Sequence, residues 1–167
     1  ASAQVIDVNV GSDVQLGYIV APAGVEYVGT FSSDNEEVAT VSQEGIVSAR
    51  KNGKANIIVT VVDKADNTIV LKKEITVKTP VTGLNLNASD KLLLLDEEEQ
   101  KPTFQINATV LPTTASNQKV SYASSNEGVA TVSATGLVTG VGEGEAVITV
   151  TTEDGHKTQT VNITVNR

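Results

Sequence analysis

The sequence predicts an all-β chain made of two similar domains, and three observations lead to this prediction. The stretch Phe31–Val47 returns as Tyr122–Val138 at a constant offset of 91 positions, which indicates two copies of one domain. The apolar residues are mainly Val, Ile, Leu and Ala, with 3% aromatic residues and no Met or Trp. This composition favours pleated strands over helices. Short apolar–polar alternations separated by Gly, Asn, Asp and Pro complete the pattern of an all-β fold.

Strands can be placed in the first copy from the alternation of apolar and polar residues, with turn residues between them. They are expected at 5–10, 14–20, 25–31, 38–41, 46–47, 55–62 and 68–77. Ser32–Asn35 and Gln43–Gly45 are turns, the second a hairpin whose glycine takes positive φ. Seven short strands in fewer than 80 residues predict an immunoglobulin-like β-sandwich.

The second copy follows the same order of strands. They are expected at 81–86, 91–95, 103–111, 120–123, 129–132, 137–139, 145–152 and 158–165. The boundary falls at Lys78–Pro80, so the predicted domains are 1–79 and 80–167. The second copy has about ten more residues ahead of the repeated stretch. This difference indicates that the first copy lacks an opening strand.

Charge and composition exclude several classes of function. The net charge is −8 and the sequence has no basic stripe, which argues against nucleic acid as a partner. No apolar run approaches the ~18 residues of a membrane span, so no direct membrane insertion is expected. The absence of cysteine removes disulfides and thiolate chemistry. His156 is the only histidine, which leaves no basis for a catalytic triad or a histidine-rich metal site, and no cofactor is expected.

The repeated stretch resembles the bacterial Ig-like domain of group 2. The matching features are an aromatic residue, Ser-Ser-(Asp/Ser)-Asn, Val-Ala-Thr-Val-Ser, a Gly before Ile/Leu-Val, and Gly-x-Ala-x-Ile. That family usually has Trp at the aromatic position, where this chain has Phe31 and Tyr122. The matching residues receive structural roles as turn caps, close-packed small residues, core valines and a positive-φ glycine. They are Phe31, Ser33, Asn35, Ala39, Val41 and Gly45 in the first copy, and Tyr122, Ser124, Asn126, Ala130, Val132 and Gly136 in the second.

The resemblance implies an extracellular, non-catalytic function. The leading hypothesis is a structural or display module of a bacterial cell-surface or adhesin-type protein, acting as a rigid spacer and interaction surface. A second hypothesis is an outward-facing part of a phage virion protein (tail, fibre or capsid) that aids attachment to the host. A third is a carbohydrate-binding accessory module of a larger enzyme. The expected partners are protein or carbohydrate on a cell surface, or neighbouring virion or surface subunits.

Two features are candidates for binding. Tyr27 is the aromatic residue most expected to be exposed, whereas the other aromatics are expected in the core. The acidic turn formed by Asp96, Glu97, Glu98 and Glu99 could present oxygen ligands to calcium. Its spacing lacks the alternation of a calcium loop, so a solvated acidic turn is favoured and no metal site is predicted.

Overall fold

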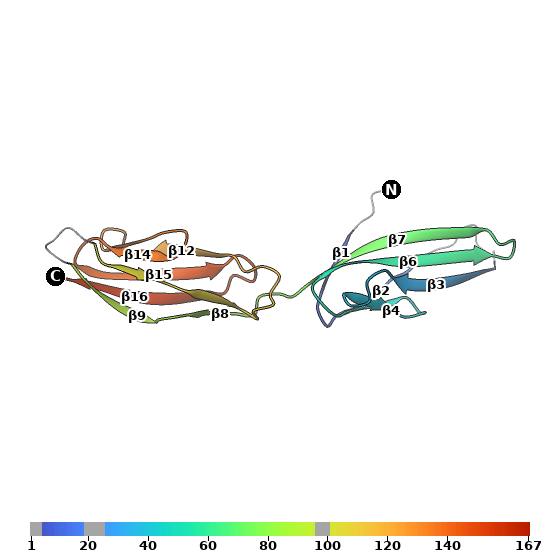
Figure 1. The fold of residues 1–167 in the computed structure, drawn as a ribbon, viewed down its shortest axis with the longest axis horizontal. Coiled ribbons are helices and arrows are strands. Elements are labelled where there is room, and N and C mark those ends of the chain that lie inside the picture. The colour runs from blue at the N-terminus through green and yellow to red at the C-terminus, as the bar shows by residue number, and fades with distance from the viewer. Residues whose placement is uncertain (1–4, 19–25, 96–100) are drawn as a thin grey trace. The chain divides into compact units, whose positions relative to one another are not determined.

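The computed structural model describes residues 5–18, 26–95 and 101–167 (Figure 1). The chain divides between Thr79 and Pro80 into two compact units, Ala1–Thr79 and Pro80–Arg167. The described residues form sixteen strands and no helix. The all-β prediction is therefore confirmed, with an immunoglobulin-like sandwich in each half of the chain.

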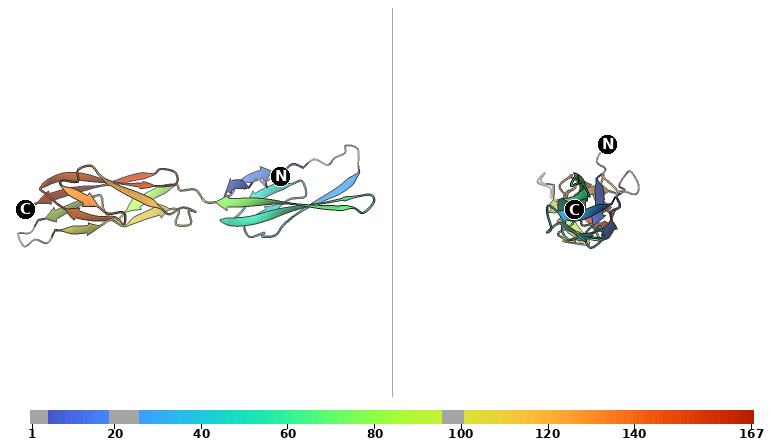
Figure 2. Two further views of the ribbon diagram at one scale, coloured as in Figure 1. Left: turned by 90° about the horizontal axis from the view of Figure 1, so that it is seen from above. Right: turned by 90° about the vertical axis from the view of Figure 1, so that its right-hand side faces the viewer.

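The first unit consists of two sheets. One has the strand order β1-β7-β6-β3 and the other β2-β5-β4 (Figures 1 and 2). β1 pairs parallel with β7, and all other pairs are antiparallel. The strands are β1 (Ile6–Asn9), β2 (Asp13–Gln15), β3 (Tyr27–Ser33), β4 (Ala39–Val41), β5 (Ile46–Ala49), β6 (Gly53–Asp63) and β7 (Thr68–Lys78).

The core of the first unit follows from strand alternation. Along β6, buried side chains alternate with less buried ones because successive residues point to opposite faces of the sheet. Ile57 is at the centre with no exposed surface, and it packs with β-branched and small side chains of the facing sheet. The buried residues of β6 are Ala55, Ile57, Val59 and Val61.

The second unit repeats this architecture and adds a two-stranded sheet. The strand orders are β12-β15-β16-β9, β10-β14-β13 and β8-β11. β9 pairs parallel with the last strand β16, as β1 does with β7. The strands are β8 (Gly83–Leu86), β9 (Asp90–Leu94), β10 (Thr103–Gln105), β11 (Ala108–Leu111), β12 (Val120–Ser124), β13 (Ala130–Val132), β14 (Leu137–Gly140), β15 (Gly144–Thr152) and β16 (Thr158–Asn166).

One predicted strand, 103–111, is two strands in the structure. β10 pairs with β14 and β11 pairs with β8, so the segment changes partner at Ile106 and Asn107. The Asn87 side-chain oxygen accepts the Asn107 N–H at 2.8 Å, and the Asn87 amide donates to the Gln105 carbonyl at 3.0 Å. These bonds replace the regular ladder at the change of partner. The prediction of one continuous strand was wrong because these bonds come from a distant residue.

The repeated residues make the same contacts in both units. The Leu16 N–H donates to the Gly45 carbonyl at 2.9 Å, and the Ile106 N–H donates to the Gly136 carbonyl at the same distance. β2 therefore corresponds to β10. β1 corresponds to β9, because both pair parallel with the last strand of their unit. In the described part of the first unit, no strand corresponds to β8.

Candidate functional surfaces

The Ser and Asn residues of the repeated stretch close its turn. The Ser33 hydroxyl oxygen accepts the Asn35 N–H at 3.2 Å, and the Asn35 carbonyl accepts the N–H groups of Val38 and Ala39, each at 3.1 Å. In the second unit, Ser124 Oγ accepts the Asn126 N–H at 3.2 Å. The side chains of Ser33 and Ser124 are thus occupied in building the turn.

The apolar residues of the stretch lie in or against the core. Ala39 and Ala130 are fully buried, so a larger side chain would have to be fitted into a packed core. Val41 and Val132 are half-buried and pack against the cores of their units. The aromatic ring of Phe31 is buried, and Tyr122 is half-buried with its pKa raised by desolvation.

The first surface with accessible side chains surrounds Tyr27 at one end of the first unit. Tyr27 is 43% exposed, and its ring stands edge-on to Tyr18 at a centroid distance of 6.1 Å. A hollow of about 470 Å³ beside it is also lined by Val28 and by Lys64, whose ammonium group pairs with the Glu26 carboxylate. This hollow offers an aromatic face with charges of both signs around it.

The acidic clusters do not form a metal centre within the described residues. Asp96, Glu97, Glu98 and Glu99 lie outside the described residues. Across the described ranges, no three His, Asp or Glu side chains gather as metal ligands would. In the other acidic stretch, Asp34 accepts the Asn56 N–H at 2.7 Å and the Asn56 side-chain amide at 2.8 Å. These bonds lower the pKa of Asp34 and give it a structural role.

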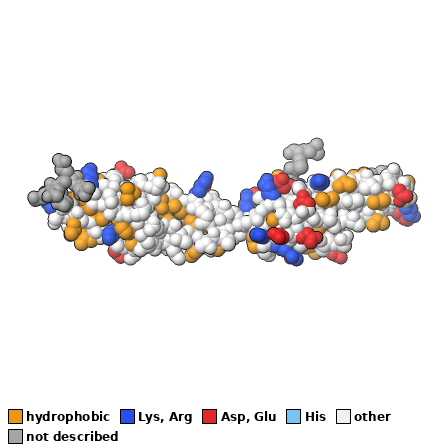
Figure 3. Space-filling view, viewed as in Figure 1, with side chains coloured by type: hydrophobic (Ala, Val, Ile, Leu, Met, Phe, Trp, Pro, Cys, Tyr) orange, Lys and Arg blue, Asp and Glu red, His pale blue; other side chains and the backbone are white. Residues whose placement is uncertain are grey.

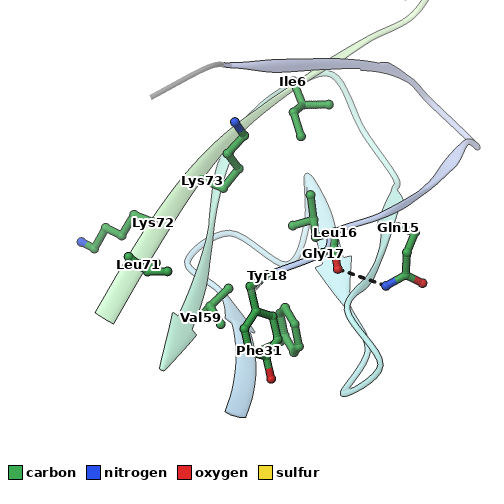
Figure 4. Close-up of a pocket in the computed structure, with 10 residues that line it drawn as sticks. All are labelled: Ile6, Gln15, Leu16, Gly17, Tyr18, Phe31, Val59, Leu71, Lys72 and Lys73. Carbon is green, nitrogen blue, oxygen red and sulfur yellow. Dashed lines mark hydrogen bonds between the residues drawn. The ribbon is translucent and has the colours of Figure 1, made fainter. Parts of the chain in front are cut away.

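The second surface is a groove of about 450 Å³ in the first unit (Figure 4). The edge of β7 at Leu71–Lys73 forms one side, and the segment Leu16–Tyr18 forms the other. Val59 and Phe31 lie between them, and Ile6 closes one end. The groove therefore exposes core side chains between the two sheets. Sequence reasoning did not predict this groove.

The visible surface is mixed in charge. On the face in Figure 3, acidic and basic side chains of the first unit lie next to one another with apolar side chains between them. Ion pairs such as Lys54 with Glu74, at 2.8 Å, and Lys78 with Asp7, at 2.7 Å, are exposed and contribute little to stability. None of the described residues form a helix long and apolar enough to cross a membrane.

Comparisons with known proteins agree with this architecture. The family model of the bacterial Ig-like domain (group 2) matches residues 2–71 and 98–163. An Ig-like virion protein of Serratia phage KSP90 is 31% identical over 163 residues, which cover 95% of this chain and 60% of that protein. The kappa-carrageenase of Pseudoalteromonas carrageenovora is 46% identical over 86 residues, covering 52% of this chain and 20% of the enzyme.

Among solved structures, Drosophila N-cadherin EC1-4 has a TM-score of 0.55 at 15% identity, covering 99% of this chain and 48% of that one. At this identity the likeness concerns the fold alone. The chain spans 60% of the phage protein and a fifth of the carrageenase. Both relatives are therefore longer polypeptides than the part that matches this chain.

Proposed function

Because the chain belongs to the bacterial Ig-like domain (group 2) family, we propose that it is a non-catalytic structural module displayed on the outside of a phage particle. The observation that carries this proposal is the relation to the Ig-like virion protein, which extends over 95% of the chain and so includes both units. The repeated residues support it, because they form turns and cores and are not arranged as a reactive site.

The proposed mechanism is presentation of side chains on a stable scaffold. Each unit has its own hydrophobic core, which holds the strands in place with little cost in conformational freedom on binding. The surface around Tyr27 and the groove beside Leu71 are the accessible features that such a module would present to a host surface or to a neighbouring subunit.

The test is the location of the chain in its source culture. An antibody against the chain is used to probe purified virions and cell-envelope fractions, before and after protease treatment of intact particles. We expect the signal to sediment with virions and to be lost when intact particles are treated with protease. An internal virion protein, probed in parallel, should survive the treatment.

A signal confined to the cell envelope would overturn the virion assignment and favour the adhesin-type surface module. Binding to matrix proteins and glycans would then be the next measurement. A signal that follows virions but resists protease would place the chain inside the particle and contradict display.

A second function is favoured by the 46% identity to part of a kappa-carrageenase. In this alternative, the chain is a carbohydrate-binding accessory module of a larger enzyme, with Tyr27 stacking on a sugar ring. Affinity electrophoresis in gels containing carrageenan tests it. Retardation that is lost in Tyr27→Ala and kept in Tyr122→Phe would support this function, whereas unchanged mobility of the original chain would exclude carrageenan as the ligand.

A further inference from the structure

One face of the four-stranded sheet of the first unit carries apolar side chains that point away from the core. Phe31 and Val59 are directly paired on β3 and β6 and belong to the core. Val28 and Val62 are also paired, three positions from these residues, so they project from the opposite face, because successive residues of a strand alternate between faces. Val28 is 67% exposed, and Val70, on the same face of β7, is 53% exposed.

These side chains form one continuous surface, the outer patch, which consists of Val28, Ile58, Val62 and Val70. Val62 lies directly opposite Val28, and both Val62 and Ile58 are diagonal neighbours of Val70 in the register of β6 with β7. Opposite and diagonal neighbours in a sheet are close enough for their side chains to interact. The positions between them carry hydroxyl side chains, those of Thr30, Ser32, Thr60 and Thr68. A contiguous apolar patch on a solvent-facing sheet is typical of an interaction site.

The second unit has charged and polar side chains at the same positions. Lys119 and Glu153 stand 91 positions after Val28 and Val62, and they form an ion pair at 3.6 Å. The Glu153 N–H also donates to the Lys119 carbonyl at 2.9 Å, so the two residues are neighbours across the strands. The other two positions of the outer patch are occupied by Thr149 and Thr158. A folded sandwich thus does not require apolar residues on this face, and their presence in the first unit needs another explanation.

Opposite charges border the outer patch on its two sides. Lys72 lies opposite Ile58 on β7 and is exposed. Asp34 follows β3 on the other side, where its carboxylate accepts the Asn56 N–H at 2.7 Å. A second copy of the patch, turned by 180° about an axis along β6, brings Lys72 of one copy next to Asp34 of the other, and the reverse contact forms at the same time. The patch is therefore complementary in charge to itself.

We propose that the outer patch is the contact surface between two copies of this chain, which pack face to face about a two-fold axis along β6. Ile58 and Val62 of each copy lie near the axis and face their own counterparts, while Lys72 and Asp34 pair on both sides of it. Sheets that pack face to face bury the side chains between them, and a two-fold contact uses the same patch on both copies. The contact is smaller than a standard interface of about 800 Å² per partner, so the dimer is weak and reversible. The proposal does not depend on whether the chain is displayed on a virion.

The test is sedimentation equilibrium of the full chain between about 10 μM and about 1 mM, the range in which a small interface forms. We expect the weight-average mass to rise from 17.4 kDa toward twice that value as the concentration increases. Amide chemical shifts of the ¹⁵N-labelled chain, compared at the two ends of this range, locate the contact. They should change at the four residues of the outer patch and stay constant in the second unit.

A double substitution taken from the second unit removes the patch while keeping a pair of residues that the fold accepts. Val28→Lys combined with Val62→Glu places the Lys119–Glu153 pair at the corresponding positions of the first unit. In the dimer the two introduced carboxylates would face each other near the axis, so self-association should be lost at every concentration. Leu137→Lys, which introduces a charge at a 40% exposed apolar residue of the second unit, is the control and should leave self-association unchanged.

A single charge reversal tests the complementarity of the patch. Lys72→Glu should weaken self-association by about tenfold or more, because both contacts with Asp34 of the other copy become repulsive. Lys157→Glu, the same reversal at an exposed lysine of the second unit, should leave the dissociation constant unchanged. Lys72 is exposed, so the amide spectrum of its variant should show a folded chain.

Four outcomes would overturn the proposal. A mass of 17.4 kDa at every concentration would mean that the copies do not associate. A dimer that persists in the double variant, or equal effects of Lys72→Glu and Lys157→Glu, would place the contact elsewhere. Growth beyond a dimer would mean that two different surfaces meet, which contradicts a two-fold contact.

Discussion

Gly45 and Gly136 occupy backbone positions that allow no side chain. Their φ angles are 81° and 84°, and a Cβ atom on either would lie 2.8 Å from a backbone oxygen, that of Leu16 or Ile106. Left-handed backbone and overpacking both oppose a larger residue. We expect Gly45→Ala and Gly136→Ala each to lower the free energy of unfolding of its unit by about 2–5 kcal/mol, measured by urea denaturation.

Gly11 provides the matched control for this prediction. Its φ is also 81°, but an added Cβ would meet nothing within 4 Å. Gly11→Ala should therefore cost only about 1 kcal/mol, from backbone strain offset by the lower entropy of the unfolded chain. Equal losses in Gly11→Ala and Gly45→Ala would show that the close contacts with Leu16 and Phe31 do not matter.

Asp34 should make the stability of the first unit sensitive to acid. Its hydrogen bonds to the Asn56 side chain and backbone hold its pKa below the ordinary value of 3.8 in the folded state. This contribution is present above the unfolded pKa of about 3.9 and is lost as pH falls through the folded pKa. We expect Asp34→Ser to reduce the fall in melting temperature of the first unit below about pH 4.

The second unit supplies the reason for choosing serine. Ser125 Oγ accepts the Val147 N–H at 2.8 Å, in the place where Asp34 accepts the Asn56 N–H. The neutral hydroxyl makes the same bond without titrating in this range. The reverse change, Ser125→Asp, should add acid sensitivity to the second unit, and an unchanged pH profile in both variants would contradict the assigned role.

The strand β8 should contribute strongly to the second unit, because it covers the core. Leu84→Ala removes a buried side chain and should lower the free energy of unfolding of that unit by about 2–5 kcal/mol. Leu92→Ala, on β9, the next strand along the chain, removes a side chain that is 53% exposed. This change should alter the free energy of unfolding by no more than about 0.5 kcal/mol. Urea denaturation followed by circular dichroism measures both, and similar values would contradict the covering role of β8.

The sequence predicted most strands because alternation and turn residues are local signals. It did not predict the change of partner at Ile106 and Asn107, since the bonds that allow it come from Asn87, about twenty residues away in the chain. Nor did it identify the bonds of Gln15 and Gln105, whose side-chain amides donate across the sheet to the carbonyls of Glu44 and Thr135, each at 2.8 Å. Glutamine in a strand has no spacing that indicates such a bond.

The candidate surfaces were predictable only in part. Tyr27 was expected to be the exposed aromatic residue, and it is 43% exposed in the structure. Whether a groove forms depends on which strand covers which core residue. Predicting the groove would therefore have required the strand pairing, which the sequence alone does not give. That Leu71 lies opposite the core residue Val59 is known only from the register of β6 with β7.

Each unit should unfold according to its own core. The two clusters of buried residues are drawn from separate units, and Ile57 and Ile148 occupy the same position of the repeat in each, both with no exposed surface. Ile57→Ala should lower the free energy of unfolding of the first unit by about 2–5 kcal/mol, and Ile148→Ala should do the same for the second.

Hydrogen exchange of the full chain, measured amide by amide, distinguishes destabilisation of the first unit from destabilisation of the second. In Ile57→Ala the core amides of β6 should exchange faster while those of β15 keep their rates, and Ile148→Ala should show the reverse. If either substitution accelerated exchange equally in both units, the cores would form one cooperative structure. Separate responses would mean that a partner bound to one unit stabilises that unit alone, because binding energy reaches only the core to which it is coupled.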